Sequence, residues 1–280
     1  MRIAALIAPL PKIFYGSHGY YGMGKRGGPK EFFYNLVERM LGHVGITINS
    51  SEDERLYAME KLHIPSSRIR VIHNGVDTDR FAPPLPGEKV SARSLMGLPL
   101  NGKILLTIGR VSVQKNLEAL YDVLNEMLPN SDWAFCHAGA GSTVLRSYLS
   151  PEAAQRCHAF EHLNDVVPLL HASDGFVMTS RYEGLSLTML EAMSCGIPCL
   201  LTDAMGFRFL KQQRFHEIIW LSNPDSEEEL KNSLKKSLSA WSAVPSQILT
   251  EQREIICERF NQHRQISEYI SLFEECSTNS

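Results

Sequence analysis

Two glutamates within one short segment are the residues of this chain best placed to do chemistry. Glu183 and Glu191 are separated by seven residues in the stretch Ser180 to Pro198, SRYEGLSLTMLEAMSCGIP. Glu183 falls where a strand is expected to end, and Glu191 falls inside the helix expected next. Ligands of open α/β sheets bind outside the carboxyl ends of the strands, beside helix N-termini. The spacing therefore predicts one cleft in which both carboxylates accept hydrogen bonds from sugar or ribose hydroxyls beside a bound phosphate.

Two cations occupy a similar position earlier in the chain. Arg110 follows a strand expected over residues 103–108, and Lys115 precedes a helix expected over residues 116–127. Cations at the carboxyl end of a strand, next to a helix N-terminus, form a strong site for a diphosphate. Taken with the two glutamates, they predict a site for a nucleotide sugar.

These segments together resemble the retaining glycosyltransferases of family 4, which have the two-domain GT-B fold. The resemblance implies that Glu183 contacts the donor sugar, that Glu191 contacts the nucleotide ribose, and that Arg110 and Lys115 contact the donor diphosphate. It also implies transfer of a hexose from a nucleotide diphosphate sugar to a carbohydrate or lipid-linked glycan acceptor, with retention at the anomeric carbon. In that scheme the leaving phosphate accepts the proton of the acceptor, so no metal and no other cofactor is expected.

Glycine-rich turns add weaker candidates. The backbone amides between the two glutamates are expected to cradle a phosphate or a sugar hydroxyl; they belong to Gly184, Leu185 and Ser186. Gly139 begins a glycine turn after an expected strand, where either a nucleotide contact or a plain turn is consistent with the pattern. His18 lies in a glycine-dense loop over residues 16–28. By resemblance it approaches the donor sugar across the cleft, although a histidine in such a loop also occurs without any role.

Strand and helix patterns alternate regularly from residue 103 onward, which predicts a parallel, doubly wound sheet. The fold class is therefore α/β, of the GT-B type implied by the resemblance. A complete Rossmann-like C-terminal domain is expected together with a truncated N-terminal Rossmann-like domain. The expected units are a partial acceptor-side domain (1–80), a linker rich in proline and glycine (81–100), a donor-binding domain (101–260), and a C-terminal helix that packs back towards the N-terminal part (261–280).

Half of a sheet predicts an unpaired strand edge and an exposed apolar face. Three explanations stay open for the short N-terminal domain: a truncated reading frame, a second chain that supplies the missing half, or a degenerate remnant. Two other functions also stay open. The chain is either a non-catalytic or partner-dependent donor-binding subunit, or a nucleotide-sugar epimerase of GT-B fold, which would turn over without an acceptor.

Composition limits the remaining classes. A net charge of −3 and a pI near 6.4 over 280 residues argue against a nucleic-acid partner. Residues 1–48 carry six cations against two acids, which favours contact with an anionic membrane surface as much as ordinary surface charge. Six cysteines without a CxxC pair indicate reduced thiols. With no long apolar run and no convincing signal peptide, the sequence predicts a cytoplasmic protein, either free or peripheral on the inner face of the plasma membrane.

Overall fold

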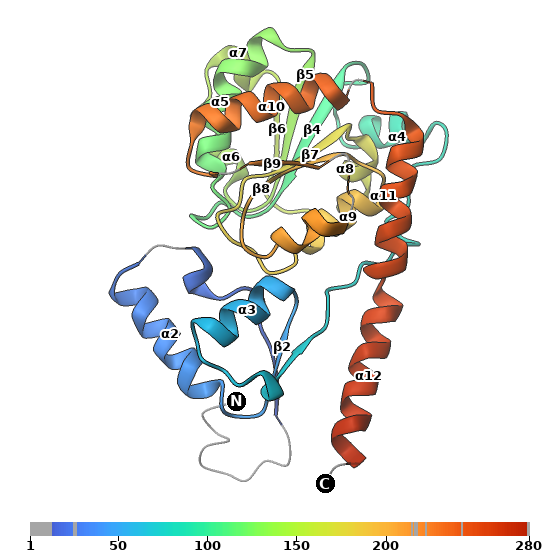
Figure 1. The fold of residues 1–280 in the computed structure, drawn as a ribbon. Coiled ribbons are helices and arrows are strands. Elements are labelled where there is room, and N and C mark those ends of the chain that lie inside the picture. Colours follow the sequence, from blue (N-terminus) through green and yellow to red (C-terminus); the bar gives the residue numbers. More distant parts are fainter. Residues whose placement is uncertain are drawn as a thin grey trace.

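The computed structural model describes residues 13–24, 27–213, 215, 218–221, 223–241 and 243–278. Figure 1 shows two parts joined by extended chain, with the C-terminal helices α11 (Ser246–Arg259) and α12 (Gln262–Thr278) running beside the larger and the smaller part, respectively. The larger part contains a six-stranded sheet, and the smaller part contains a three-stranded sheet.

The larger sheet has the strand order β6-β5-β4-β7-β8-β9, and every neighbouring pair is parallel. Its strands are β4 (Lys103–Ile108), β5 (Trp133–Ala138), β6 (Cys157–Phe160), β7 (Gly175–Met178), β8 (Cys199–Thr202) and β9 (Ile218–Leu221). Nearly continuous apolar runs such as KILLTI in β4 are typical of parallel strands, which are buried on both faces. The predicted parallel, doubly wound sheet is confirmed.

Alternate side chains of these strands enter two separate cores, one on each face of the sheet. One core contains Leu105, Phe135, Val177 and Leu200, and the other contains Ile104, Leu106, Phe176 and Leu201. Helices cover both faces (Figure 1). They are α5 (Leu117–Met127), α6 (Ser142–Arg146), α7 (Pro151–Ala154), α8 (Val167–Ala172), α9 (Leu187–Ser194), α10 (Glu227–Trp241) and α11 (Ser246–Arg259).

The smaller sheet consists of three parallel strands in the order β1-β2-β3. Its elements are β1 (Phe14–Gly16), α2 (Pro29–Leu41), β2 (Ile46–Asn49), α3 (Glu52–Glu60) and β3 (Ile69–Val71). Helix α3 begins at a serine cap, since Ser51 Oγ accepts from the Glu54 amide at 3.2 Å, as in a capping box. The Glu54 side chain, however, returns to the amide of Ser50 rather than to that of Ser51. Among the described residues, β1 pairs with β2 alone.

Part of the segment predicted as a linker is folded. Helix α4 (Glu88–Leu95) lies within residues 81–100 and packs against α8. At the other end of the chain, α12 (Gln262–Thr278) lies along the smaller sheet (Figure 1). Leu272 shares a core with Ile48 and Ile72, and the ring of Phe273 meets that of Phe14 at a centroid distance of 4.8 Å.

Asp174 is the acidic centre of the contact between α4 and the larger sheet. Its carboxylate accepts from the buried Arg93 guanidinium at 2.7 Å, from Lys89 Nζ at 2.7 Å and from the Ile104 amide at 2.8 Å. Removing one partner of a buried pair leaves a charge without compensation. The sequence alone does not show this pairing, because the partners are about 80 residues apart.

We expect Asp174→Ala to lower the free energy of unfolding by roughly 3–5 kcal/mol, the usual cost of breaking a buried ion pair. Glu268→Ala is the matched control, since its 2.8 Å pair with Arg264 on α12 is partly exposed and its loss should cost less than about 1 kcal/mol. Denaturant unfolding measures both. Equal effects of the two substitutions would contradict a structural role for Asp174.

Candidate active site

The candidate site lies where the strand order of the larger sheet reverses. Strand β4 lies between β5 and β7. From β4 the chain adds β5 and then β6 on one side of it, and afterwards adds β7, β8 and β9 on the other side. Ligands of doubly wound sheets bind in the crevice at such a switch point, beyond the carboxyl ends of the strands. The turns after β4 (109–116) and after β7 (179–186) border this crevice, and they contain most of the predicted site residues.

An ion pair joins these two turns. Lys115 Nζ lies 2.7 Å from Glu183 Oε1, and the two side chains are only 18% and 9% exposed. The main chains of the turns are also fixed to each other: the Gln114 side chain donates to the carbonyl of Tyr182 at 3.1 Å, and Thr179 Oγ1 donates to the carbonyl of Lys115 at 3.0 Å. The structure therefore brings two predicted site residues, 68 positions apart, into direct contact.

Arg110 and Gly139 belong to neighbouring turns at the same end of the sheet. Arg110 is exposed. A Cβ atom on Gly139, whose φ is +146°, would lie 2.2 Å from the carbonyl oxygen of Gly109, so a side chain cannot be accommodated there. The close approach that the glycine makes possible is with the neighbouring turn. A nucleotide contact by Gly139 stays a prediction.

Two residues that the sequence did not single out for a role hold these turns. The buried His137 lies between the carbonyl oxygen of Gly109, 2.8 Å from Nε2, and the hydroxyl of Tyr121, 3.0 Å from Nδ1. Burial lowers the pKa of His137. Glu161 accepts from the amides of Gly141 and Thr143 at 2.8 and 3.0 Å. Hydrogen bonds from the Thr143 side chain and from these amides lower the pKa of Glu161 to about 2.

Helix α9 carries the second glutamate. Glu191 is half-buried, and burial raises the pKa of its carboxyl group. Ser186 is the residue before the helix, and its hydroxyl lies 3.1 Å from that of Thr188. The Leu185 amide donates to Ser50 Oγ of the smaller part at 3.0 Å. This amide, predicted to face the donor, is therefore already engaged in this conformation.

His18 lies on the smaller part, in the loop that meets the turn after β7. Its side chain is exposed. The next residue, Gly19, packs directly on that turn, because a Cβ atom on Gly19 would lie 3.2 Å from the Gly184 amide nitrogen. His18 is thus within one residue of a backbone contact with the Glu183–Gly184 peptide. An approach of its side chain to the donor stays a prediction.

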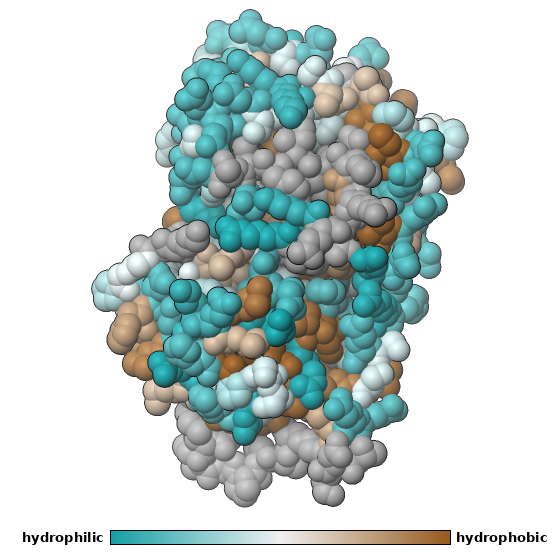
Figure 2. All heavy atoms as spheres, in the orientation of Figure 1, coloured by the Kyte–Doolittle hydropathy of each residue, from teal (hydrophilic) through white to brown (hydrophobic). Residues whose placement is uncertain are grey.

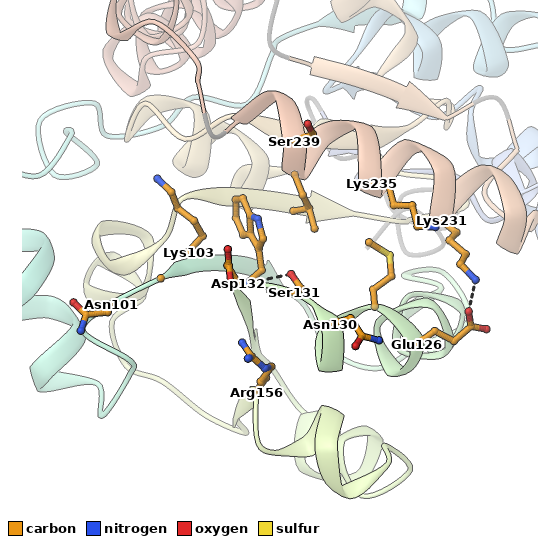
Figure 3. A pocket seen from close by; sticks show the side chains of 14 residues that line it. Asn101, Lys103, Glu126, Asn130, Ser131, Asp132, Arg156, Lys231, Lys235 and Ser239 are labelled. Atoms are coloured by element: carbon orange, nitrogen blue, oxygen red, sulfur yellow. Dashed lines mark hydrogen bonds and ion pairs between the residues drawn. The ribbon is translucent and has the colours of Figure 1, made fainter.

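Two depressions lie at opposite ends of the larger sheet. A cavity of about 210 Å³ lies at the junction of the two parts, lined by Met23, Gly24, Arg181, Asp203, Met205, Arg208, Asn223, Pro224 and Asp225. A larger one, of about 1060 Å³, lies at the amino ends of β4 and β5 (Figure 3). Lys231 pairs there with Glu126 across helices α10 and α5. Ligands of open α/β sheets bind at the carboxyl ends of the strands, so the smaller cavity lies on the side expected for a binding site. None of the predicted site residues lines this cavity.

Within the described ranges, no group of three or more histidine, cysteine, aspartate or glutamate side chains is arranged to hold a metal ion. None of the helices in the same ranges has the length and apolar character needed to cross a membrane.

Comparison with protein families assigns both parts of the chain. The model of "Glycosyl transferases group 1" matches residues 102–240, and that of "Glycosyltransferase Family 4" matches residues 1–80. A UDP-Gal:α-D-GlcNAc-diphosphoundecaprenol α-1,3-galactosyltransferase of Escherichia coli is 28% identical over 235 residues, which are 80% of this chain and 60% of that enzyme. The lipopolysaccharide core mannosyltransferase LpsB of Rhizobium meliloti is 34% identical over 156 residues, 52% of this chain and 43% of that protein. The chain thus spans about half the length of these relatives.

Solved structures confirm the GT-B fold. Sucrose-phosphate synthase of Thermosynechococcus elongatus superposes with a TM-score of 0.79 at 18% identity, over 95% of this chain and 68% of that one. Anabaena HepE, solved in complex with UDP-glucose, gives a TM-score of 0.77 at 19% identity, over 98% of this chain and 75% of that one. At these identities the likeness establishes the fold.

Proposed function

Because this chain belongs to the group 1, family 4 glycosyltransferases, we propose that it transfers a hexose from a nucleotide diphosphate sugar to a carbohydrate or lipid-linked acceptor, with retention of the anomeric configuration. The observation that carries the proposal is the Lys115–Glu183 contact of 2.7 Å at the switch point. The E. coli relative is named for a diphosphoundecaprenol-linked acceptor, and the R. meliloti relative for lipopolysaccharide core synthesis. Both names support a role in cell-surface polysaccharide assembly.

The proposed chemistry depends on charge. As the bond between the anomeric carbon and the phosphate oxygen breaks, negative charge grows on the leaving diphosphate. Lys115 uses one of its three N–H donors on Glu183 and keeps two for phosphate oxygens, and the exposed Arg110 supplies a second cation. The acceptor oxygen forms the new bond on the same face of the sugar, and its proton passes to the leaving phosphate. A bound metal is not part of this scheme.

Each carboxylate has a distinct proposed role. Glu183, oriented by Lys115, accepts hydrogen bonds from the hydroxyls of the donor sugar, and Glu191 accepts from the ribose. Gly139, Gly184 and Ser186 contribute backbone contacts. A donor-binding subunit that depends on a second chain is the alternative function. An epimerase is the other alternative, and product analysis without an acceptor distinguishes it from a transferase.

Donor binding tests the role of Glu191. Titration calorimetry with UDP-, GDP-, ADP- and dTDP-sugars should show selective binding of one donor. We expect Glu191→Ala to weaken that binding about tenfold or more, because one or two hydrogen bonds to a charged group are lost. Glu118→Ala, at an exposed position of α5, should bind normally. Binding of no donor, or normal binding by Glu191→Ala, would contradict the assignment.

Transfer kinetics test the role of Lys115. We expect Lys115→Ala to lower kcat by about 10²–10³-fold, the usual loss when one donor that stabilises developing negative charge is removed. Lys103→Ala is the matched control, since Lys103 begins β4, at the end of this strand opposite to the turn that carries Lys115. Transfer of radiolabelled sugar to an acceptor glycan measures both variants. The idea fails if both variants transfer sugar at the wild-type rate.

We also propose that α2 contacts an anionic membrane surface on the cytoplasmic side. This helix directs its polar face inward: Glu38 accepts from the hydroxyl of Tyr15, and Asn35 from that of Tyr57, each at 3.1 Å. Its outward face is apolar, with Phe32 71% exposed, and it continues through Phe33, Leu36 and Met40. Figure 2 shows hydrophobic side chains along this edge of the smaller part.

Two cations border this apolar face. Lys30 and Arg39 are exposed on α2, about 180° apart around the helix and on either side of the apolar stripe. Aromatic and aliphatic side chains flanked by cations are typical of helices that lie in the membrane interface. The other cations expected to contribute, Arg2, Lys12, Lys25 and Arg26, lie outside the described residues.

Vesicle sedimentation tests this surface. The double variant Phe32→Ser/Phe33→Ser should bind vesicles containing anionic phospholipid roughly tenfold less than wild type, because two exposed rings no longer enter the interface. Leu85→Ser, a change at an exposed apolar residue in the segment between the two parts, is the control. Sedimentation independent of the two phenylalanines, or no sedimentation of wild type, would indicate that a protein covers α2 instead.

A further inference from the structure

Glu54 is a carboxylate with no exposed surface, situated between the two parts of the molecule. Its Oε1 accepts from the amide of Gly19. Its Oε2 accepts from the amide and hydroxyl of Ser50, at 2.5 and 3.0 Å, and from the hydroxyl of Ser17 at 3.2 Å. Fully buried glutamates are rare unless a cation pairs with them, yet all these donors are neutral. Burial raises the pKa of Glu54, and the hydrogen bonds act in the opposite direction.

Two of the residues bound by Glu54 flank His18. Ser17 precedes the histidine and Gly19 follows it, so one carboxylate binds both neighbours of His18, the first through its side-chain hydroxyl and the second through its backbone amide. Ser17 is held further, because its amide donates to the carbonyl of Ile48 at 2.9 Å and its hydroxyl accepts from Asn49 at 2.7 Å. The His18 side chain itself is exposed, so its main chain is fixed while the ring faces solvent.

The same carboxylate also contacts the donor side of the cleft. A Cβ atom on Gly184 would lie 2.9 Å from Glu54 Oε1 and 2.8 Å from Ser50 Oγ, so the turn after Glu183 approaches this cluster by its bare backbone. The Leu185 amide donates to Ser50 Oγ, as described above. Glu54 therefore lies between the segment that carries His18 and the segment that carries Glu183.

We propose that Glu54 is a positioning residue, which fixes His18 relative to Glu183 and so holds the two sides of the reacting centre in register. The inference rests on the proposed glycosyl transfer. The requirement is for a carboxylate rather than for any polar side chain of this size. A glutamine offers one acceptor oxygen, so its NH₂ group would face either the amide of Gly19 or that of Ser50, donor against donor. Either arrangement loses the hydrogen bond to one of these amides. Gly19 belongs to the segment that carries His18, and Ser50 binds Leu185 in the segment that carries Glu183.

The neighbouring acid offers a matched control. Asp53 Oδ2 accepts from the amides of Gly206 and Arg208 at 2.9 and 3.0 Å, so it holds a different loop of the larger part from the same turn of α3. Asp53→Asn should disturb the contact between the two parts to a similar degree as Glu54→Gln. It leaves in place the carboxylate that holds both neighbours of His18.

The test is a double-mutant cycle on the full chain, with the rate of sugar transfer as its readout. Glu54→Gln should lower kcat about 10²-fold, as small misplacements at a reacting centre do, and should leave the dissociation constant of the donor within about threefold. In a His18→Ala background the same change should cost less than about twofold, because its effect passes through the histidine. Asp53→Asn should have the same effect in both backgrounds.

Equal losses for Glu54→Gln with and without His18, or an unchanged kcat, would overturn the proposal. If Glu54→Gln does not fold, Ser17→Ala replaces it in the cycle, since it removes one bond of Glu54 next to the histidine. A wild-type chain without transfer activity would refute the proposed function alone. Hydrogen exchange then decides the positioning role: Glu54→Gln must reduce protection of residues 16–20 and of residues 183–186 together, and unchanged protection of either overturns the inference.

Discussion

Backbone contact between turns, made possible by glycine, is the constraint on which this site depends. A Cβ atom on Gly139 would overlap the carbonyl of Gly109, one on Gly184 would crowd the Glu54 carboxylate, and one on Gly206 would lie 2.1 Å from the carbonyl of Glu183. Parallel strands deliver their following turns to a single edge of the sheet, but side chains would keep those turns apart. Gly139 and Gly206 let the neighbouring turns pack closely on the turns that carry Lys115 and Glu183. Within these packed turns, the side chains of Lys115 and Glu183 are paired and largely shielded from water.

Shielding gives the Lys115–Glu183 pair its proposed use. A cation paired with a carboxylate at 2.7 Å is held in one orientation before any ligand arrives, so little reorganisation is needed when charge develops on a diphosphate. The pair is also close to neutral overall, which leaves the exposed Arg110 as the cation available to attract an anionic donor. Lys115 thus provides a pre-oriented cation and Arg110 attracts the donor, although the two residues are only five positions apart in the same turn.

Sequence patterns predicted the strands of the larger sheet correctly, for a physical reason. Strand β4 has the predicted bounds because a buried parallel strand is a nearly continuous apolar run, and residues that follow adjacent parallel strands meet regardless of their separation in the chain. The same patterns could not predict the roles of His137, Glu161 or Glu54, since each depends on a partner fixed only by tertiary packing. Helix α4 was not predicted, for the same reason: its short segment follows three prolines, and its buried Arg93 is stabilised by the distant Asp174.

The two parts also share a core, which connects the stability of the smaller part to the site. Tyr182, from the turn after β7, packs with Tyr20, Met23 and Tyr57 of the smaller part and is 9% exposed. The side chain of the next residue, Glu183, forms the ion pair with Lys115. Of these two successive residues, Tyr182 packs in the core of the smaller part, and Glu183 belongs to the proposed site on the larger part. A three-stranded sheet has little apolar surface of its own to bury. Any motion that opens the cleft must therefore expose Tyr182 as well, which favours the conformation in which His18 and Glu183 are close in space.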